Sequence, residues 1–212
     1  MAAQTRPARQ EKDGRRDLMD IAIDCFARYG YQGASIDRIA KAAGLTKGAI
    51  YYHFTDKEEL LFEAVRNRVS QFERRVTSDL GGVTDAVAAL RRVTSVCLEH
   101  ATKSNHRRLI VTLMVEALDT NARLSAQFRD MMRRFRAFLR GIIEAGQRQG
   151  VFRNDLDAAT AAGVYAGAVM GAEIEYYQDP TAIDLGEHLQ TFLDSYLTWL
   201  ASPATAAARK RR

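Results

Sequence analysis

Proline, cysteine and long apolar runs are all scarce in this chain of 212 residues. The three prolines are Pro7, Pro180 and Pro203, so residues 8–179 contain none. Because proline interrupts helices and is common in the turns of β-sandwiches, this stretch favours long helices. The longest apolar run, Ala158 to Ala172, is shorter than the roughly 20 residues that a membrane-spanning helix needs. We therefore expect an all-α protein that does not enter a membrane.

The two cysteines, Cys25 and Cys97, lie far apart and match no CxxC or Cys/His pattern. We interpret them as buried thiols of a protein in the reducing cytoplasm, without a metal or another cofactor. The N-terminus has no apolar segment of a secretory signal, which agrees with this location. The motifs GxGxxG, GxxxxGK[ST], GxSxG and HExxH are also missing. Nothing in the sequence indicates an enzyme.

The net charge of +5 is distributed unevenly along the chain. Residues 1–60 carry ten basic and nine acidic side chains. Residues 61–150 carry sixteen basic and nine acidic side chains, and residues 151–208 carry one basic and eight acidic side chains. The polar, basic ends predict a flexible arm over residues 1–13 and a disordered tail over residues 202–212. Because the first sixty residues are nearly neutral, the charge does not favour a protein that binds DNA regardless of its sequence.

Apolar residues at helical spacing predict about nine helices. The first carries one stripe from Leu18 to Tyr29 and ends at Gly30, which we interpret as a left-handed cap. Later apolar stripes predict helices over roughly 84–101, 107–118, 124–142, 155–177 and 181–200. Arg129, Arg133, Arg136 and Arg140 lie beside one of these stripes, and we interpret them as a solvated face.

Two short helices around a glycine turn are the most informative feature. Ser35 is the predicted N-cap of the first, and Gly44 ends it. Thr46 caps the second, and Thr55-Asp-Lys-Glu58 is a predicted capping box for the helix that follows. This pattern predicts a helix-turn-helix, whose second helix enters the major groove of DNA.

The second helix has an unusual surface for a purely structural element. Gly48 lowers helix stability by about 1 kcal/mol relative to alanine, but its missing side chain lets the backbone approach DNA. The hydroxyls of Tyr51 and Tyr52 and the ring of His53 can donate to phosphate, and Lys47 can reach phosphate or guanine. Ser35, Thr46 and the Thr55–Lys57 segment lie at helix N-termini, which attract phosphate.

Alternatives remain for single residues of this group. One of Tyr51 and Tyr52 can pack inward instead, since neighbouring helical residues point about 100° apart. His53 can be a partly buried residue that holds the turn, and Lys57 can be an ordinary solvated side chain.

These residues resemble the tetracycline-repressor (TetR) family of bacterial transcriptional regulators. The resemblance covers the first third of the chain and is carried by Gly33-Ala-Ser-Ile-Asp-Arg-Ile-Ala-Lys-Ala-Ala-Gly44-Leu-Thr-Lys-Gly-Ala-Ile-Tyr-Tyr-His-Phe54-Thr-Asp-Lys-Glu-Glu-Leu60, together with Ala22, Phe26 and Gly30. It implies a DNA-binding domain over residues 14–74 and a helical ligand-binding and dimerisation domain over residues 75–201. The implied DNA contacts are Ser35, Thr46, Lys47, Gly48, Tyr51, Tyr52, His53 and Lys57. The resemblance also implies a homodimer that represses transcription at an operator until a small molecule releases it.

The last two predicted helices carry much apolar surface. Glycines at every fourth position allow close approach of another helix, either within the chain or across a dimer interface. The resemblance favours a two-fold interface of four helices. Its predicted residues are Gly163, Gly167, Gly171, Leu189, Phe192, Tyr196 and Trp199.

The ligand pocket is expected among the middle helices. Its candidate residues are Cys97, His100, Met114, Phe128, Met131, Phe135, Tyr165, Val169, Glu173 and Tyr176. Aromatic and methionine side chains at this spacing equally suit an ordinary core. His100 and Glu173 are more indicative, because a polar group on an apolar face needs a partner.

The predicted function is a ligand-responsive repressor that binds a palindromic double-stranded DNA operator as a homodimer. The alternatives are an activator with the same fold, a regulator without a ligand, and a helical module that binds only protein.

Overall fold

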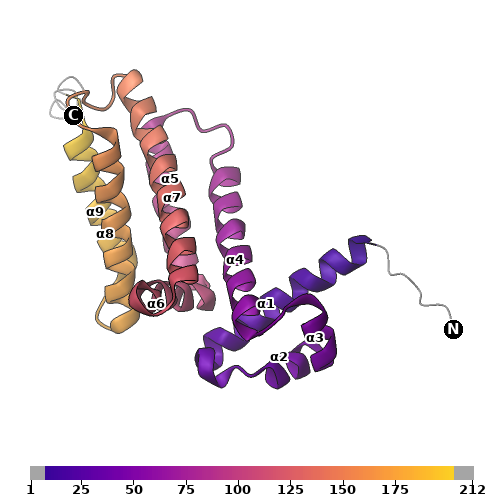
Figure 1. The fold of residues 1–212 in the computed structure, drawn as a ribbon. Coiled ribbons are helices and arrows are strands. Elements are labelled where there is room, and N and C mark those ends of the chain that lie inside the picture. Colours follow the sequence, from indigo (N-terminus) through magenta and orange to yellow (C-terminus); the bar gives the residue numbers. More distant parts are fainter. Residues whose placement is uncertain (1–7, 203–212) are drawn as a thin grey trace. The chain divides into compact units, whose positions relative to one another are not determined.

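The computed structural model describes the backbone of residues 8–202, and Figure 1 shows its helices. Within these residues the chain is all-α, as predicted, with one isolated bridge between Phe152 and Ala201. The helices are α1 (Ala8–Gly33), α2 (Ile36–Ala43), α3 (Lys47–His53), α4 (Lys57–Asp79), α5 (Ala86–Lys103), α6 (Asn105–Thr120), α7 (Ala122–Arg148), α8 (Ala158–Gln178) and α9 (Leu185–Leu200).

The described ends of the chain differ in part from the predicted arm and tail. Helix α1 begins at Ala8, ahead of the expected start of the first domain at residue 14. Ala8 to Lys12 are good helix formers, which explains why the helix extends beyond its apolar stripe. The rest of the predicted arm, residues 1–7, and residues 203–212 of the predicted tail lie outside the described residues.

The chain divides into two compact units. The first contains α1 to α3, α4 as far as Arg74, and Asn105–Ala117 of α6. The second contains the end of α4, α5, the end of α6 from Leu118, α7, α8 and α9. No helix within residues 8–202 is long and apolar enough to cross a membrane.

The apolar stripe of α1 lies in the core of the first unit. Leu18, Ala22 and Phe26 are buried, and so is Cys25. Gly30 interrupts the helical backbone with φ 70° and ψ 170°, so the break falls where it was predicted although helical residues continue to Gly33. This positive φ is a conformation that glycine adopts at little cost. The break lets the chain turn toward α2, which packs against α1.

A polar network joins three helices of the first unit. His106 on α6 hydrogen-bonds Asp24 of α1 through Nε2 and Arg68 of α4 through Nδ1. A guanidinium only donates, so Nδ1 of His106 accepts and Nε2 donates to the Asp24 carboxylate. Asp20 extends the network, because its Oδ1 lies 4.0 Å from Nη1 of Arg68 and accepts from Asn67 Nδ2 at 3.3 Å. These contacts attach α6 to the helices that support the helix-turn-helix.

The second unit packs α5, α7, α8 and α9 together. Tyr165 of α8 is fully buried, and its hydroxyl lies 2.6 Å from the Thr94 hydroxyl of α5. The Tyr196 hydroxyl of α9 donates to the Ala161 carbonyl of α8 at 2.7 Å. These two hydrogen bonds satisfy polar groups inside an otherwise apolar interface.

Candidate DNA-binding surface

Short-range hydrogen bonds define both ends of α2 and the start of α3. The Ser35 Oγ accepts from the Arg38 N–H at 3.2 Å, and the Thr46 Oγ1 accepts from the Ala49 N–H at 3.2 Å, which confirms both predicted caps. Gly44 ends α2 in the left-handed conformation, with φ 64° and ψ 27°. Its N–H and that of Leu45 bond back to α2 carbonyls. Three residues therefore turn the chain from one helix into the next.

Helix α3 has one buried face and one exposed face. Ile50 and the adjoining Phe54 are buried in the first unit. Tyr51 is 52% exposed and Tyr52 is 76% exposed, so neither tyrosine packs inward. Lys47 and Gly48 are exposed on the same helix. An added Cβ at Gly48 would meet only the Thr46 Oγ1 within 4 Å, at 3.8 Å, so this part of the surface is open.

His53 and Lys57 occupy more constrained positions than these tyrosines. The His53 ring is half-buried and makes edge contacts with the rings of Tyr52 and Phe54. The Lys57 Nζ donates to the Tyr31 carbonyl at 2.9 Å and lies 4.3 Å from the centroid of the Tyr31 ring. Lys57 therefore ties the start of α4 to the end of α1 and is not an ordinary solvated side chain. Burial, followed by the negative charge of Glu58, raises the pKa of the Tyr31 phenol.

The cap of α4 differs from the predicted capping box by one residue. Asp56 is the capping side chain, since its Oδ1 accepts from the Glu59 N–H at 2.7 Å. Glu59 reaches back to the N–H and hydroxyl of Thr55, each at 2.7 Å. The predicted box of Thr55 and Glu58 was therefore wrong. Asp56 and Glu59 have the same spacing and the same complementary groups, and sequence spacing alone does not choose between the two registers.

Two charged residues that the sequence did not single out as DNA contacts belong to this surface. Asp37, in the first turn of α2, forms an ion pair with Lys47, with Oδ2 and Nζ 2.7 Å apart. The Arg38 guanidinium donates to the Gly33 carbonyl at 3.1 Å and lies 4.1 Å from the Tyr29 ring centroid. Both contacts link segments about five to ten residues apart, so helical periodicity does not reveal them.

The predicted ligand residues are divided between the two units. Met114 belongs to the first unit, whereas the other nine belong to the second. Cys97, Phe128, Met131, Tyr165, Val169 and Glu173 are buried, and His100, Met114, Phe135 and Tyr176 are half-buried. Glu173 is only 1% exposed although it is ionisable. Burial raises the pKa of the Tyr165 phenol well above its usual value, with a smaller contribution from Cys97.

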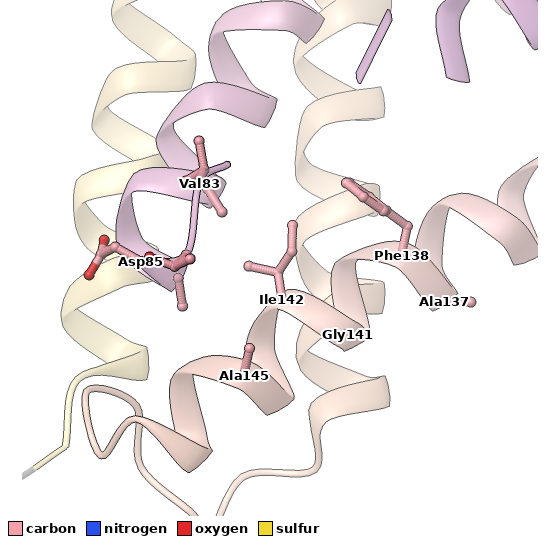
Figure 2. A pocket seen from close by; sticks show the side chains of 10 residues that line it. Val83, Asp85, Ala137, Phe138, Gly141, Ile142 and Ala145 are labelled. Carbon is pink, nitrogen blue, oxygen red and sulfur yellow. The ribbon is translucent and has the colours of Figure 1, made fainter. Parts of the chain in front are cut away.

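Two of the hollows that the described residues line lie on the second unit. One, of about 370 Å³, is an apolar groove between the Val83–Ala89 segment and α7, where Phe138, Gly141 and Ile142 line it (Figure 2). The other, of about 550 Å³, lies beside the loop from Pro180 to Asp184. Of the ten predicted ligand residues, Tyr176 alone lines either hollow.

The predicted dimer residues fall into two groups. Leu189 and Tyr196 are buried within the chain itself. Phe192 is half-buried, and Trp199 is 39% exposed. An added Cβ at Gly163, Gly167 or Gly171 would meet nothing within 4 Å, so the glycine face of α8 is open in the single chain.

Comparison with known proteins identifies the family. Residues 18–64 match the model of bacterial regulatory proteins of the tetR family, and residues 87–169 match the tetracyclin repressor-like C-terminal domain. Together the two matches span more than half of the chain. The chain belongs to the TetR family. It is a DNA-binding transcriptional regulator, of the class of ligand-responsive repressors.

Individual relatives match along most of their length. The transcriptional repressor KstR2 of Rhodococcus jostii is 28% identical over 91% of this chain and 94% of its own. A TetR regulator from Chloroflexus aurantiacus superposes with a TM-score of 0.79 at 26% identity, covering 91% and 98% of the two chains. A regulator from Saccharomonospora viridis, solved in complex with choline, has a TM-score of 0.76 at 26% identity, covering 88% and 96%.

Proposed function

We propose that this TetR-family chain is a repressor that binds a palindromic operator as a homodimer and leaves it when a small molecule binds. Residues 14–74 read the DNA, and residues 75–201 bind the effector and form the dimer. The observation that carries the proposal is the division of α3 into two faces. Ile50 anchors it to the core, while Lys47, Tyr51 and Tyr52 stay exposed. A short helix that is capped, buried on one side and polar on the other is suited to insertion into a major groove.

Some residues of this surface contact the DNA, and others hold the helices in position. Lys47 reaches a base edge or phosphate, and the hydroxyls of Tyr51 and Tyr52 donate to phosphate oxygens. Gly48 leaves room for the sugar-phosphate backbone to approach α3 closely. Four further residues hold the ends of helices through the contacts described above: Ser35, Thr46, His53 and Lys57. Their remaining hydrogen-bond donors face the DNA. Specific affinity then comes from placed donors rather than from net charge.

The open glycine face of α8 supports the proposed dimer. Gly163, Gly167 and Gly171 have free space around them in the single chain, and Trp199 of α9 is 39% exposed. A second copy related by a two-fold axis would cover this face with its own α8 and α9. Leu189 and Tyr196 support the interface from inside the chain, because they hold α9 against the rest of the second unit. The two recognition helices would then read half-sites about 34–36 Å apart.

The effector is proposed to bind beside the inner face of α8. Tyr165, Val169 and Glu173 follow one another at every fourth residue and are all buried. A buried carboxyl group complements a cationic or hydrogen-bond-donating group, and a buried aromatic ring such as that of Tyr165 also attracts a cation. The related regulator that holds choline makes quaternary ammonium compounds the first probes. Release requires that the effector bind the DNA-free conformation more tightly than the DNA-bound one.

The test is selection of duplexes from a randomised library with the full-length protein, followed by titration of a recovered duplex. Replacing Tyr52 with alanine should weaken binding by about 100-fold or more, since a dimer loses the contact at both half-sites and each hydrogen bond to a charged phosphate is worth about 1.5–3 kcal/mol. Because Tyr52 is 76% exposed, the melting temperature should not change. Lys47→Ala should behave in the same way. The control is Leu118→Ala, which removes another exposed side chain, 66% exposed, from the second unit.

Two outcomes would contradict the proposal. Undiminished binding by Tyr52→Ala and Lys47→Ala would remove α3 from the interface. A fall, rather than a rise, in transcription beside the selected sites when the gene is deleted would make the protein an activator.

A further inference from the structure

Asp37 is the only acidic residue between Asp24 and Asp56, a segment that also contains Arg28, Arg38, Lys41 and Lys47. It lies in the exposed first turn of α2, and its side chain is 66% exposed. A surface that approaches phosphates should exclude carboxylates, because like charges repel and a negative charge reduces the gain from counterion release. The presence of Asp37 in this position therefore calls for a reason.

Folding stability does not supply that reason. The pair between Asp37 and Lys47 joins two side chains that are 66% and 55% exposed, and ion pairs this exposed contribute little to stability. The start of α2 already has its cap from Ser35. A first-turn anion adds only a small further stabilisation through the helix dipole.

The geometry instead gives Asp37 a role in the choice of DNA. Its Oδ2 lies 2.7 Å from the Nζ of Lys47, the first residue of the proposed recognition helix. We propose that Asp37 is a specificity-determining residue, which holds the Lys47 ammonium in place for a base edge and offsets its attraction for phosphates of any sequence. The inference rests on the proposed DNA-binding function of α3.

Two physical effects make the pair selective. On an arbitrary duplex the Lys47 charge is already compensated and the Asp37 carboxylate is repelled, so non-specific binding is weakened. At the operator the lysine is held in one arrangement before binding, so less side-chain entropy is lost when it donates to a base. Specificity depends on the difference between these two affinities, and an unfavourable contact with the wrong DNA increases it.

The experiment measures binding of the full-length protein to a duplex recovered by selection and to a scrambled duplex of equal length and composition. Asp37→Asn keeps the size of the side chain and removes its charge. The variant should bind the scrambled duplex about 3- to 10-fold more tightly, and its slope of log K against log salt should steepen by about 2, because a dimer loses two carboxylates. The ratio of selected to scrambled affinity should fall by about 5- to 10-fold.

Matched variants separate a specific role from a general effect of charge. Glu187→Gln makes the same change of charge in the first turn of α9 and should leave both affinities unchanged. Asp37→Glu keeps the charge and should keep most of the specificity. In a Lys47→Gln background, Asp37→Asn should lose most of its effect, because its partner is gone.

Each failure has its own signature. A wild-type protein that binds both duplexes equally would refute the proposed function, and the role of Asp37 with it. A wild-type preference that Asp37→Asn leaves unchanged would refute only the role of Asp37. An effect of Asp37→Asn that persists in full without Lys47 would also overturn it, since the carboxylate would then act by general charge alone.

Discussion

The substitution Gly167→Leu tests the proposed dimer, because a side chain at this position causes no steric clash within the single chain. An added Cβ there meets nothing within 4 Å, and glycine is a poorer helix former than leucine. The folded chain should therefore tolerate Gly167→Leu. If α8 packs against a second copy through this face, the new side chain instead enters a close contact between two helices.

The size of the effect follows from the symmetry. Overpacking a well-packed site costs about 1–3 kcal/mol. A two-fold interface contains Gly167 twice, so the free energy of dimerisation should fall by about 2–6 kcal/mol. This loss raises the dissociation constant of the dimer by about 30-fold to about 20,000-fold. Operator affinity should fall with it, since a single recognition helix reads only one half-site.

The assay is sedimentation velocity over a dilution series, with the helix content of each variant followed by circular dichroism. Gly141→Leu is the matched control, because Gly141 is also helical and also has no atom within 4 Å of an added Cβ, but lies on α7. It should dimerise like the wild type. A Gly167→Leu protein that remains dimeric at the same dilution as this control would refute the reasoning and move the interface away from the glycine face of α8.

Two further predictions concern the second unit by itself. Gly146→Ala should lower the free energy of unfolding by about 1–3 kcal/mol, because the new Cβ would lie 2.8 Å from Cγ of the buried Phe152 ring. Gly141→Ala, in open space on the same helix, should raise the free energy of unfolding by about 0.5–1 kcal/mol. Equal denaturant midpoints for the two variants would contradict the close packing of Phe152 against Gly146. In alkaline solution the protein should lose stability above about pH 10, the ordinary pKa of tyrosine. Burial raises the pKa of Tyr165 in the folded state, so its contribution is complete below that pH and is lost as the pH rises further. Thermal melts across this range should show a shallower loss for Tyr165→Phe.

The parts of the structure that the sequence predicted well are those determined by neighbouring residues. Ser35, Thr46 and Gly44 act through partners three or four residues away, so their spacing was enough to predict both caps and the turn. The same reasoning failed by one residue at α4, where Thr55 and Asp56 offer equivalent capping groups. Local rules predict that a cap exists there, but they place a helix boundary only to within one or two residues.

The parts that could not be predicted depend on residues far apart in the chain. The hydrogen bond of Lys57 to the Tyr31 carbonyl spans 26 residues, and that between His106 and Asp24 spans 82. No periodic pattern connects such positions. The predicted dimer residues show the same limit, because apolar spacing on α9 does not distinguish Leu189, buried within the chain, from Trp199, which is partly exposed.

The near-neutral charge of the first sixty residues gains a physical meaning from this surface. The segment between Asp24 and Asp56 carries four basic side chains and one carboxylate, and that carboxylate, Asp37, pairs with Lys47 at the start of α3. In the proposed arrangement this pair keeps non-specific affinity low, and binding depends on whether the donors of Lys47, Tyr51 and Tyr52 meet their acceptors. Such binding is sensitive to geometry, because misplacing a few donors removes most of the affinity. A regulator of this kind therefore needs only a small displacement of its recognition helices to leave its operator.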